Sequence, residues 1–584
     1  MLPLSDLGVD GVMSCSARRI VLWAVSTVPG LLLNMAAGRA IEPVSDLPFA
    51  QAPSTDPSSP DSNFLQPTPA PSPIAPAEQI PVLPVPSAPP SPDPSPSTVT
   101  IPVHRIEVVG STVFSEADFA PVLQPAIGKS LTLEELRQVA DAVTQLYLDR
   151  GYITSRAVLV DQTIQNGLVQ IRVIEGRLEA IEIEGTRRVR PAYIRSRVRL
   201  GGDTPLNQAD LEDQLRLLRI DPLFDNVEAS LRAGSGLGQS VLTVRVAEAS
   251  PWILDLSVDN FSPPDVGSER TGAVVGTRNL TGNGDSLTAS YYRSTTGGSN
   301  VFGFAYQVPF NPMNGTLLLR YSPSNFEITN PEFAAFNIEG SANQYEVSVR
   351  QPIIRSPREE LALSLGFTHR TGRTFVSQSL TDDSTTSVVS FGQDYVRRDP
   401  QGAWAARSQF NFGTGLFNAT VGETPDGLFF SWLGQAQRVQ ILDQSNLLIA
   451  QLDVQLTPDA LLPDQQFVIG GGQSVRGYRQ NARIGDNGIR FSVEDRLALQ
   501  RNEAGNPTLQ LAPFVDLGAV WNARNTSAQF DQTFLAGVGL GLIWEPVPDL
   551  ILRLDGAVPL VDLDDRGKNA QDYGFYFSVN YQLP

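Results

Sequence analysis

The residues best placed to do chemistry lie near the C-terminus, where a glycine run precedes a cation and an aromatic ring. Three glycines at 470–472 are followed by Arg476, Gly477 and Tyr478. Such glycines let the backbone turn sharply or approach another surface closely. Arginine adds a permanent cation with a planar set of donors. Ordinary loops also contain short triplets of this kind, so the pattern alone leaves both interpretations open.

A carboxylate suited to this arginine occurs downstream, in the stretch from Phe514 to Gly518. Alternation along a strand points Phe514 and Asp516 to the same side. An arginine on a loop and a carboxylate inside a barrel can form a charge-assisted latch. We therefore predict that Arg476 pairs with Asp516, with Glu494 or Phe514 nearby and Tyr478 packed against the wall.

Residue patterns for catalysis are scarce. The two histidines, His104 and His369, fall in different predicted domains, and the sequence has no zinc pair, nucleophile elbow or phosphate-binding glycine loop. The glycine-rich stretch 234–238 joins two predicted strands without opening a helix, which indicates a hairpin. Asp564 and Asp565 are expected on solvated loop surface. We predict no enzymatic activity, no metal site and no cofactor.

Composition narrows the class of protein. The chain has 584 residues and a net charge of −19, so nucleic acid is not an expected partner. Beyond the N-terminus it lacks apolar runs of about 20 residues, which a membrane-spanning helix needs. In a transmembrane β-barrel, apolar residues that face lipid alternate with polar residues that face the lumen. The average hydropathy of such a chain can therefore resemble that of a soluble protein.

The N-terminus has the features of a secretory signal peptide. Two arginines at 18–19 precede an apolar run at 20–33, and small residues lead to Ala40. We predict a signal peptide at 1–40, with a membrane anchor as the alternative. The single cysteine, Cys15, lies upstream of the apolar run, so cleavage would leave a protein without thiols.

Downstream of the predicted cleavage site the composition changes twice. Residues 41–101 are rich in proline and predict an extended, disordered linker. Residues 102–176 and 177–249 then repeat one pattern, in which the motif at 106–110 recurs at 181–185. Two copies of a small α/β module are predicted, each with the order strand, helix, helix, strand, strand.

The longer helix of the first copy carries its own start and stop signals. Thr132 can cap the helix while Glu135, three residues later, returns the hydrogen bond. Gly151 is placed to end this helix.

From residue 250 to 584 the apolar residues no longer recur with the spacing of a helix. They alternate with polar residues in short segments, as in β-strands. Leu254, Leu256 and Val258, for example, alternate with polar residues. Sixteen strands are predicted, starting near residues 252, 268, 285, 300, 316, 343, 359, 385, 402, 428, 446, 489, 508, 533, 549 and 573.

The connections between these strands favour a membrane barrel over a soluble sandwich. Those after even-numbered strands are tight, whereas many after odd-numbered strands are long, including 371–384 and 457–488. Tight turns on one side and long loops on the other are typical of a sixteen-stranded antiparallel transmembrane β-barrel with both termini in the periplasm. The connection 457–488 holds Arg476, so we expect it to fold back into the lumen. Inward glycines from 537 to 541 leave room for it.

One set of residues carries a family resemblance: Val475, Arg476, Gly477 and Tyr478, followed by Phe514, Asp516 and Gly518. This set resembles the loop-6 and strand-13 signature of the BamA-like superfamily of outer-membrane barrels. Together with the repeats, the chain from about 102 to 584 resembles the two-partner-secretion branch, the ShlB/FhaC/HecB haemolysin-activator transporters. The repeats would then be POTRA domains, POTRA 1 at 102–176 and POTRA 2 at 177–249.

The resemblance implies a place and a task. POTRA domains in the periplasm would bind an unfolded exoprotein, and a barrel in the cell outer membrane would translocate it. The implied partners are this secreted polypeptide client, the lipid bilayer with its lipopolysaccharide, and the outer-membrane assembly machinery. The last strand resembles the C-terminal insertion signal of outer-membrane proteins, but these usually end in an aromatic residue and this chain ends in Pro584. Two alternatives stay open: an assembly factor that inserts other barrels, and a passive porin-like channel.

Overall fold

The computed structural model describes residues 99–583, apart from 332, 423–424 and 524–531. The predicted signal peptide and the predicted linker up to residue 98 lie outside the described residues. Within them, no helix is both long and apolar enough to cross a membrane.

The first α/β module packs two helices on a three-stranded sheet with the order β2-β5-β4, in which β2 and β5 are parallel. Helix α2 begins after Thr132, whose side chain accepts from the Glu135 N–H while the Glu135 carboxylate accepts from the Thr132 N–H. The predicted capping box is therefore present. The elements are β1 (Thr100–Pro102), β2 (Arg105–Val109), α1 (Glu116–Leu123), β3 (Ser130–Thr132), α2 (Leu133–Asp149), β4 (Arg156–Leu159) and β5 (Leu168–Ile174).

The second module repeats the order strand, helix, helix, strand, strand of β2, α1, α2, β4 and β5, and it has the same sheet arrangement, β6-β8-β7, with β6 and β8 parallel. The glycine-rich stretch 234–238 joins two antiparallel strands, so the predicted hairpin is confirmed. Leu211, Leu215 and Leu218 form the buried stripe of α4. The elements are β6 (Arg177–Glu184), α3 (Pro191–Val198), α4 (Gln208–Arg219), β7 (Phe224–Ala233) and β8 (Gln239–Glu248).

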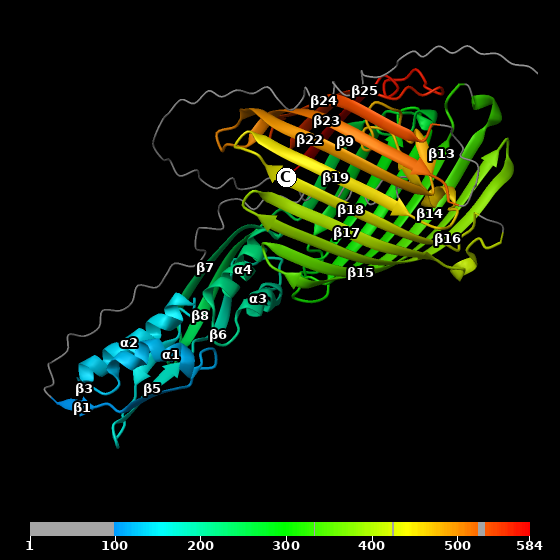
Figure 1. Cartoon of the computed structure of the whole chain (residues 1–584). Coiled ribbons are helices and arrows are strands. Elements are labelled where there is room, and N and C mark those ends of the chain that lie inside the picture. The colour runs from blue at the N-terminus through cyan, green and yellow to red at the C-terminus, as the bar shows by residue number, and fades with distance from the viewer. Residues whose placement is uncertain (1–98, 332, 423–424, 524–531, 584) are drawn as a thin grey trace, which may run out of the picture. The chain divides into compact units, whose positions relative to one another are not determined.

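The C-terminal part is a closed barrel of sixteen antiparallel strands, as predicted, in which the last strand pairs with the first. Figure 1 shows these strands side by side as one wall. The strands are β9 (Trp252–Asp259), β10 (Arg270–Arg278), β11 (Ser286–Ser294), β12 (Ser299–Pro309), β13 (Thr316–Glu327), β14 (Ile338–Arg355), β15 (Glu359–Val376), β16 (Ser379–Asp399), β17 (Gly402–Gly413), β18 (Phe430–Ile441), β19 (Asn446–Leu456), β22 (Asn487–Arg501), β23 (Pro507–Trp521), β24 (Phe534–Val547), β25 (Leu550–Pro559) and β26 (Phe575–Leu583).

One predicted connection is wrong. Residues 371–384 are not a long loop, because β15 continues to Val376 and β16 begins at Ser379. Ser377 and Gln378 have positive φ angles, as the tight turn of a two-residue hairpin requires. Residues 371–384 are mostly polar. They therefore lack the apolar alternation of lipid-facing strands, by which the other strands were predicted.

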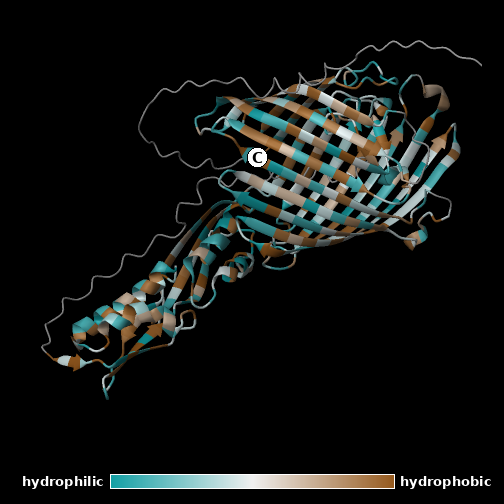
Figure 2. Cartoon of the chain, in the orientation of Figure 1, coloured by the Kyte–Doolittle hydropathy of each residue, from teal (hydrophilic) through white to brown (hydrophobic). Residues whose placement is uncertain are grey.

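The barrel wall carries apolar side chains on its outer face. Along the strands in Figure 2, hydrophobic and hydrophilic residues alternate. Leu256 and Val258 on β9 are exposed, as are Leu540 and Leu542 on β24. Exposed apolar side chains on every second residue suit contact with lipid.

The longest connection of the barrel, residues 457–486 between β19 and β22, is called the long loop below. It contains a short hairpin of two strands, β20 (Phe467–Ile469) and β21 (Arg483–Gly485), which pair with each other. Its residues share a buried apolar cluster with wall residues from β23 and β24: Phe467, Ile469, Val475, Tyr478, Ala482, Val520 and Leu535. The long loop therefore packs against the barrel wall.

Candidate functional site: the seat of the long loop

Arg476 is the centre of the site. Its Nε and Nη2 atoms donate to the two carboxylate oxygens of Asp516 at 2.7 and 3.0 Å, and its backbone N–H donates to the same carboxylate at 3.1 Å. Its Nη1 donates to Glu494 at 2.9 Å. Asp516 on β23 is fully buried, and Arg476 is 5% exposed. A planar guanidinium matches a carboxylate in this two-point geometry.

Phe514 supplies a third contact to the same cation. The Arg476 guanidinium carbon lies 3.2 Å from the centre of the Phe514 ring. The ring is buried, so water competes little for the positive charge and the cation–π attraction is strengthened. Ser492 donates to Asp516 at 2.7 Å, which fixes the carboxylate from the neighbouring strand.

Glu494 is shared by two further arginines of the wall. Arg553 donates to it at 2.6 Å and Arg496 at 2.8 Å, while Arg553 also donates to Asp555 at 2.7 Å. Three cations therefore meet three carboxylates, which limits the cost of burying charge. Sequence reasoning did not single out Arg553 and Asp555, although their alternation with Leu552 and Leu554 on β25 is a signal that could have found them.

Gly518 and Gly537 explain how the loop comes so close to the wall. A Cβ atom at Gly518 would lie 2.8 Å from a methyl carbon of Val475, which is fully buried. A Cβ at Gly537 on β24 would lie 1.9 Å from the carbonyl oxygen of Arg476. Only a residue without a side chain fits at such a distance.

The other two residues of the loop motif bind wall strands through hydroxyl groups. The Gly477 N–H donates to the Tyr576 hydroxyl at 2.9 Å, and that hydroxyl donates to the Tyr478 carbonyl at 2.5 Å. The Tyr478 hydroxyl lies 2.8 Å from the Ala536 carbonyl oxygen and 3.0 Å from that of Val561. Tyr576 is fully buried on β26, and its hydroxyl faces the long loop.

Arg490 on β22 holds the tip of the long loop. Its Nη1 donates to the Gln473 carbonyl at 2.8 Å, while its Nε and Nη2 donate to Asp453 on β19 at 2.9 and 2.6 Å. The side chains of both members of this ion pair are largely buried.

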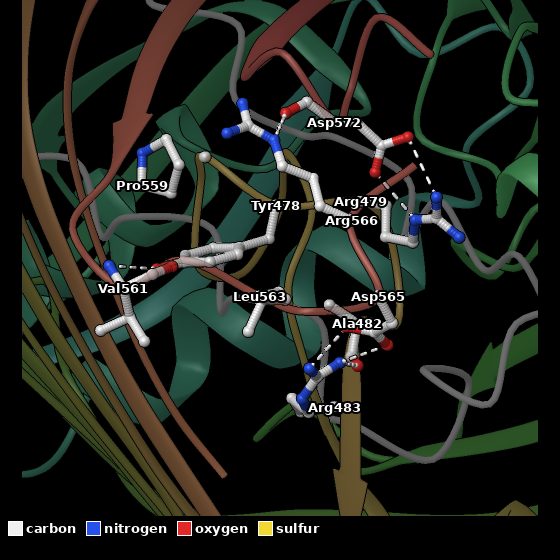
Figure 3. Close-up of a pocket in the computed structure, with 11 residues that line it drawn as sticks. Tyr478, Arg479, Ala482, Arg483, Pro559, Val561, Leu563, Asp565, Arg566 and Asp572 are labelled. Carbon is white, nitrogen blue, oxygen red and sulfur yellow. Dashed lines mark hydrogen bonds and ion pairs between the residues drawn. The ribbon is translucent and has the colours of Figure 1, made fainter. Parts of the chain in front are cut away.

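Farther along, the long loop binds the connection between β25 and β26 around a small pocket (Figure 3). Arg479 donates to Asp572 at 2.8 and 3.1 Å, and Arg483 donates to Asp565 at 2.8 and 3.0 Å. Asp565 lies on solvated loop surface, as expected, and it also binds Arg483. Its side chain is about half exposed yet bound to an arginine distant in sequence, which composition cannot reveal. Asp564 is exposed, as expected.

The structure thus brings Val475, Arg476, Gly477, Tyr478, Glu494, Phe514, Asp516 and Gly518 together at one place. The loop seat, defined here as Glu494, Phe514, Asp516 and Tyr576, holds an arginine and a turn rather than a ligand. Such hydrogen bonds and buried ion pairs hold the long loop in place while they are formed, and the loop is free to move when they break.

The sequence profile of the haemolysin secretion/activation proteins ShlB/FhaC/HecB matches residues 238–543, and that of the ShlB-type POTRA domain matches residues 101–176. The chain belongs to the ShlB/FhaC/HecB family. It is therefore an outer-membrane transporter whose POTRA domains lie in the periplasm.

Several relatives agree with this membership. The outer membrane transporter CdiB of Escherichia coli is 27% identical over 66% of this chain and 67% of its own length. The heme/hemopexin transporter protein HuxB of Haemophilus influenzae is 22% identical over 79% of this chain and 83% of its own. The hemolysin transporter protein ShlB of Serratia marcescens is 23% identical over 73% and 77%.

Solved structures agree in fold. CdiB from Escherichia coli superposes with a TM-score of 0.67 at 23% identity, covering 84% of this chain and 93% of that one. BamA from Haemophilus ducreyi, lacking its first three POTRA domains, gives a TM-score of 0.51 at 16% identity, covering 83% and 100%.

Proposed function

We propose that the protein exports a polypeptide across the outer membrane by two-partner secretion. The POTRA domains at 102–176 and 177–249 bind an unfolded exoprotein in the periplasm and pass it to the barrel at 250–584. The observation that carries this proposal is the loop seat, because a buried Arg476 bound by two carboxylates holds a long loop inside a wall of sixteen strands.

In this mechanism the long loop is a latch. Val475, Gly477 and Tyr478 fit it to the wall, Gly518 leaves room for it, and the contact between Arg476 and Asp516 keeps it in place. The client has to displace at least part of the loop, since the loop packs against the inner side of the wall. The protein binds and conducts its client without catalysing a chemical step.

The energy for export comes from the client. The periplasm has no ATP, so the forward direction must be favoured by folding of the client outside the cell. A folded client cannot re-enter, which removes the translocated state from the equilibrium.

Three classes of partner follow from this proposal. The client is a secreted protein, as the names of the hemolysin and heme/hemopexin transporters suggest for those relatives. The outer wall contacts lipid and lipopolysaccharide, and the outer-membrane assembly machinery inserts the barrel.

The proposal is tested by export of the cognate exoprotein from cells that carry Arg476→Ala. We expect export to be lost while the amount of folded barrel in the outer membrane stays close to that of the parent. Arg407→Ala is the matched control, because Arg407 also lies on the wall and pairs with an aspartate, Asp394. Unchanged export in Arg476→Ala would remove the proposed role of the latch.

A second candidate is an assembly factor that inserts other barrels into the membrane. It is favoured by the short pairing between β26 and β9, where the wall could open toward lipid. The same export assay separates the two, because an inserted client would be found in the membrane fraction and a secreted one in the medium.

A further inference from the structure

The seam at which the barrel closes is weakly paired. Strand β26 pairs with β9 only from Ser578–Asp259 to Leu583–Leu254, the shortest run of paired residues among the described barrel strands. At the extracellular end, residues 575–577 of β26 therefore lack a backbone partner in β9. Unpaired strand ends separate more readily than a full ladder.

An asparagine side chain takes the place of the missing ladder. Asn260, directly after β9, donates from Nδ2 to the Phe575 carbonyl at 3.0 Å and accepts from the Phe577 N–H at 2.8 Å. Its own backbone N–H donates to the Phe577 carbonyl at 3.3 Å. Asn260 is fully buried, so these bonds are protected from water.

A glutamine connects this asparagine to the long loop. Gln571, fully buried in the connection 560–574 between β25 and β26, donates to the carbonyl oxygens of Asn260 at 2.5 Å and Ser262 at 2.9 Å. Its side-chain oxygen accepts from the backbone N–H of Gln480 at 2.8 Å. One amide thus contacts both the end of the first strand and the long loop.

The long loop also binds the other side of the seam. Tyr576 on β26 contacts Gly477 and Tyr478, and the connection 560–574 is held by the arginine–aspartate pairs visible in Figure 3. When the loop is in its seat, it is therefore attached to both strands that form the seam.

We propose that Asn260 and Gln571 are positioning residues that form a clasp and couple the seating of the long loop to closure of the β26–β9 seam. This proposal rests on the proposed role of the loop as a latch. Coupling between two equilibria is reciprocal: a seated loop stabilises the closed seam, and a closed seam stabilises the seated loop by the same factor.

The first test measures ion conductance of the purified full-length protein in planar lipid bilayers. Gln571→Met keeps the size of the side chain and removes its hydrogen bonds. The highest-conductance state is taken as the one in which the long loop has left its seat. We expect the fraction of time in that state to rise about tenfold, because the variant loses more than one buried hydrogen bond that holds the loop and the seam. Gln409→Met, which removes an amide on β17, is the control and should leave that fraction unchanged. Equal conductance of Gln571→Met and the parent would overturn the proposal.

The second test keeps the native clasp and locks the seam. Ser257 and Asn580 are paired across it, so Ser257→Cys with Asn580→Cys should form a disulfide on oxidation. We expect oxidation to lower the frequency of loop opening several-fold relative to the reduced protein. An unchanged frequency would show that loop and seam move independently and would end the proposal.

Failure of the latch and failure of the clasp give different results. If Arg476→Ala still exports the client, the latch function is wrong whatever the conductance shows. If Arg476→Ala blocks export but the seam lock has no effect on conductance, the latch stands and the clasp is wrong.

Discussion

Two parts of the barrel wall carry the same kinds of ion pair in different surroundings. At the loop seat, the side chains of Arg476 and Asp516 are 6% and 0% exposed. On β14, β16 and β17, Asp394 binds Arg350 and Arg407, whose side chains are 33% and 31% exposed. The long loop, which brings Arg476 to the wall, makes this difference, because it excludes water from one set of charges more completely than from the other.

This difference sets the cost of breaking each pair. Removing one partner of a buried ion pair lowers the free energy of unfolding by about 3–5 kcal/mol, because the other charge stays buried and unpaired. An exposed pair contributes about 0–1 kcal/mol. Charge at the loop seat therefore holds a segment in position, whereas the more exposed pairs mainly make the lumen wall polar.

The largest effect is expected for Asp516→Ala. It leaves the Arg476 guanidinium with Glu494 but without its two-point partner, so the loop should leave its seat and stability should fall by about 3–5 kcal/mol. Denaturant unfolding of the purified protein measures the stability, and protease cleavage within 457–486 measures loop release. Asp394→Ala is the control from the more exposed pairs. A similar, small loss in both variants would break the comparison.

Gly537→Ala should have the next largest effect. The added methyl group would lie 1.9 Å from the Arg476 carbonyl oxygen, so the loop must shift, at a cost of about 1–3 kcal/mol. Gly372→Ala on β15 is the control, because its nearest neighbour would be 3.6 Å away. Faster cleavage of the loop in the first variant alone is the expected result, and equal cleavage in both would contradict the tight seat.

Tyr576→Phe should have a moderate effect. It removes the hydroxyl between Gly477 and Tyr478 and leaves the ring in place, which should cost about 1 kcal/mol for each lost bond. Hydrogen exchange at the Gly477 amide measures this contact directly. Tyr581→Phe, at an exposed position on the same strand, should leave that exchange rate unchanged.

The smallest effect is expected outside the barrel, at Glu248 in the second module. Burial opposes its charge, but the N–H groups of Val189, Arg187 and Arg188 together outweigh burial and hold the pKa of the carboxyl below its usual range. An acid with a lowered pKa stabilises the fold above its unfolded pKa of about 4.3 and loses that contribution as the pH falls further.

Hydrogen exchange at the amides of 187–189 should therefore be constant from about pH 7 to pH 5, after correction for the intrinsic rate, and faster below about pH 4. Glu248→Gln should remove this pH dependence. A profile that is the same in the variant and the parent would mean that the carboxylate does not hold this turn.

Features with a local cause could be predicted from the sequence. The capping box of Thr132 and Glu135 depends on four consecutive residues, and most strand starts depend on alternation next to a turn. Arg476 and Asp516 could be matched because each stands in a short motif, and the structure places them in contact.

Features that depend on distant segments could not be predicted in the same way. Gln571 meets Asn260 only because the barrel closes, since the two residues lie at opposite ends of the barrel sequence. The extension of β15 and β16 through residues 371–384 was missed because its polar residues lack the apolar alternation that contact with lipid imposes.

The most direct test of the central claim is to lock the long loop in its seat and measure export. Val475→Cys with Gly518→Cys should form a disulfide, because a Cβ at 518 would lie 2.8 Å from a Val475 methyl carbon. Val475→Cys alone controls for folding and insertion, because a lone side chain at 518 would press on the native Val475 methyl group. We expect no export under oxidising conditions and recovery after reduction, whereas equal export by the oxidised and reduced protein would contradict a loop that must leave its seat.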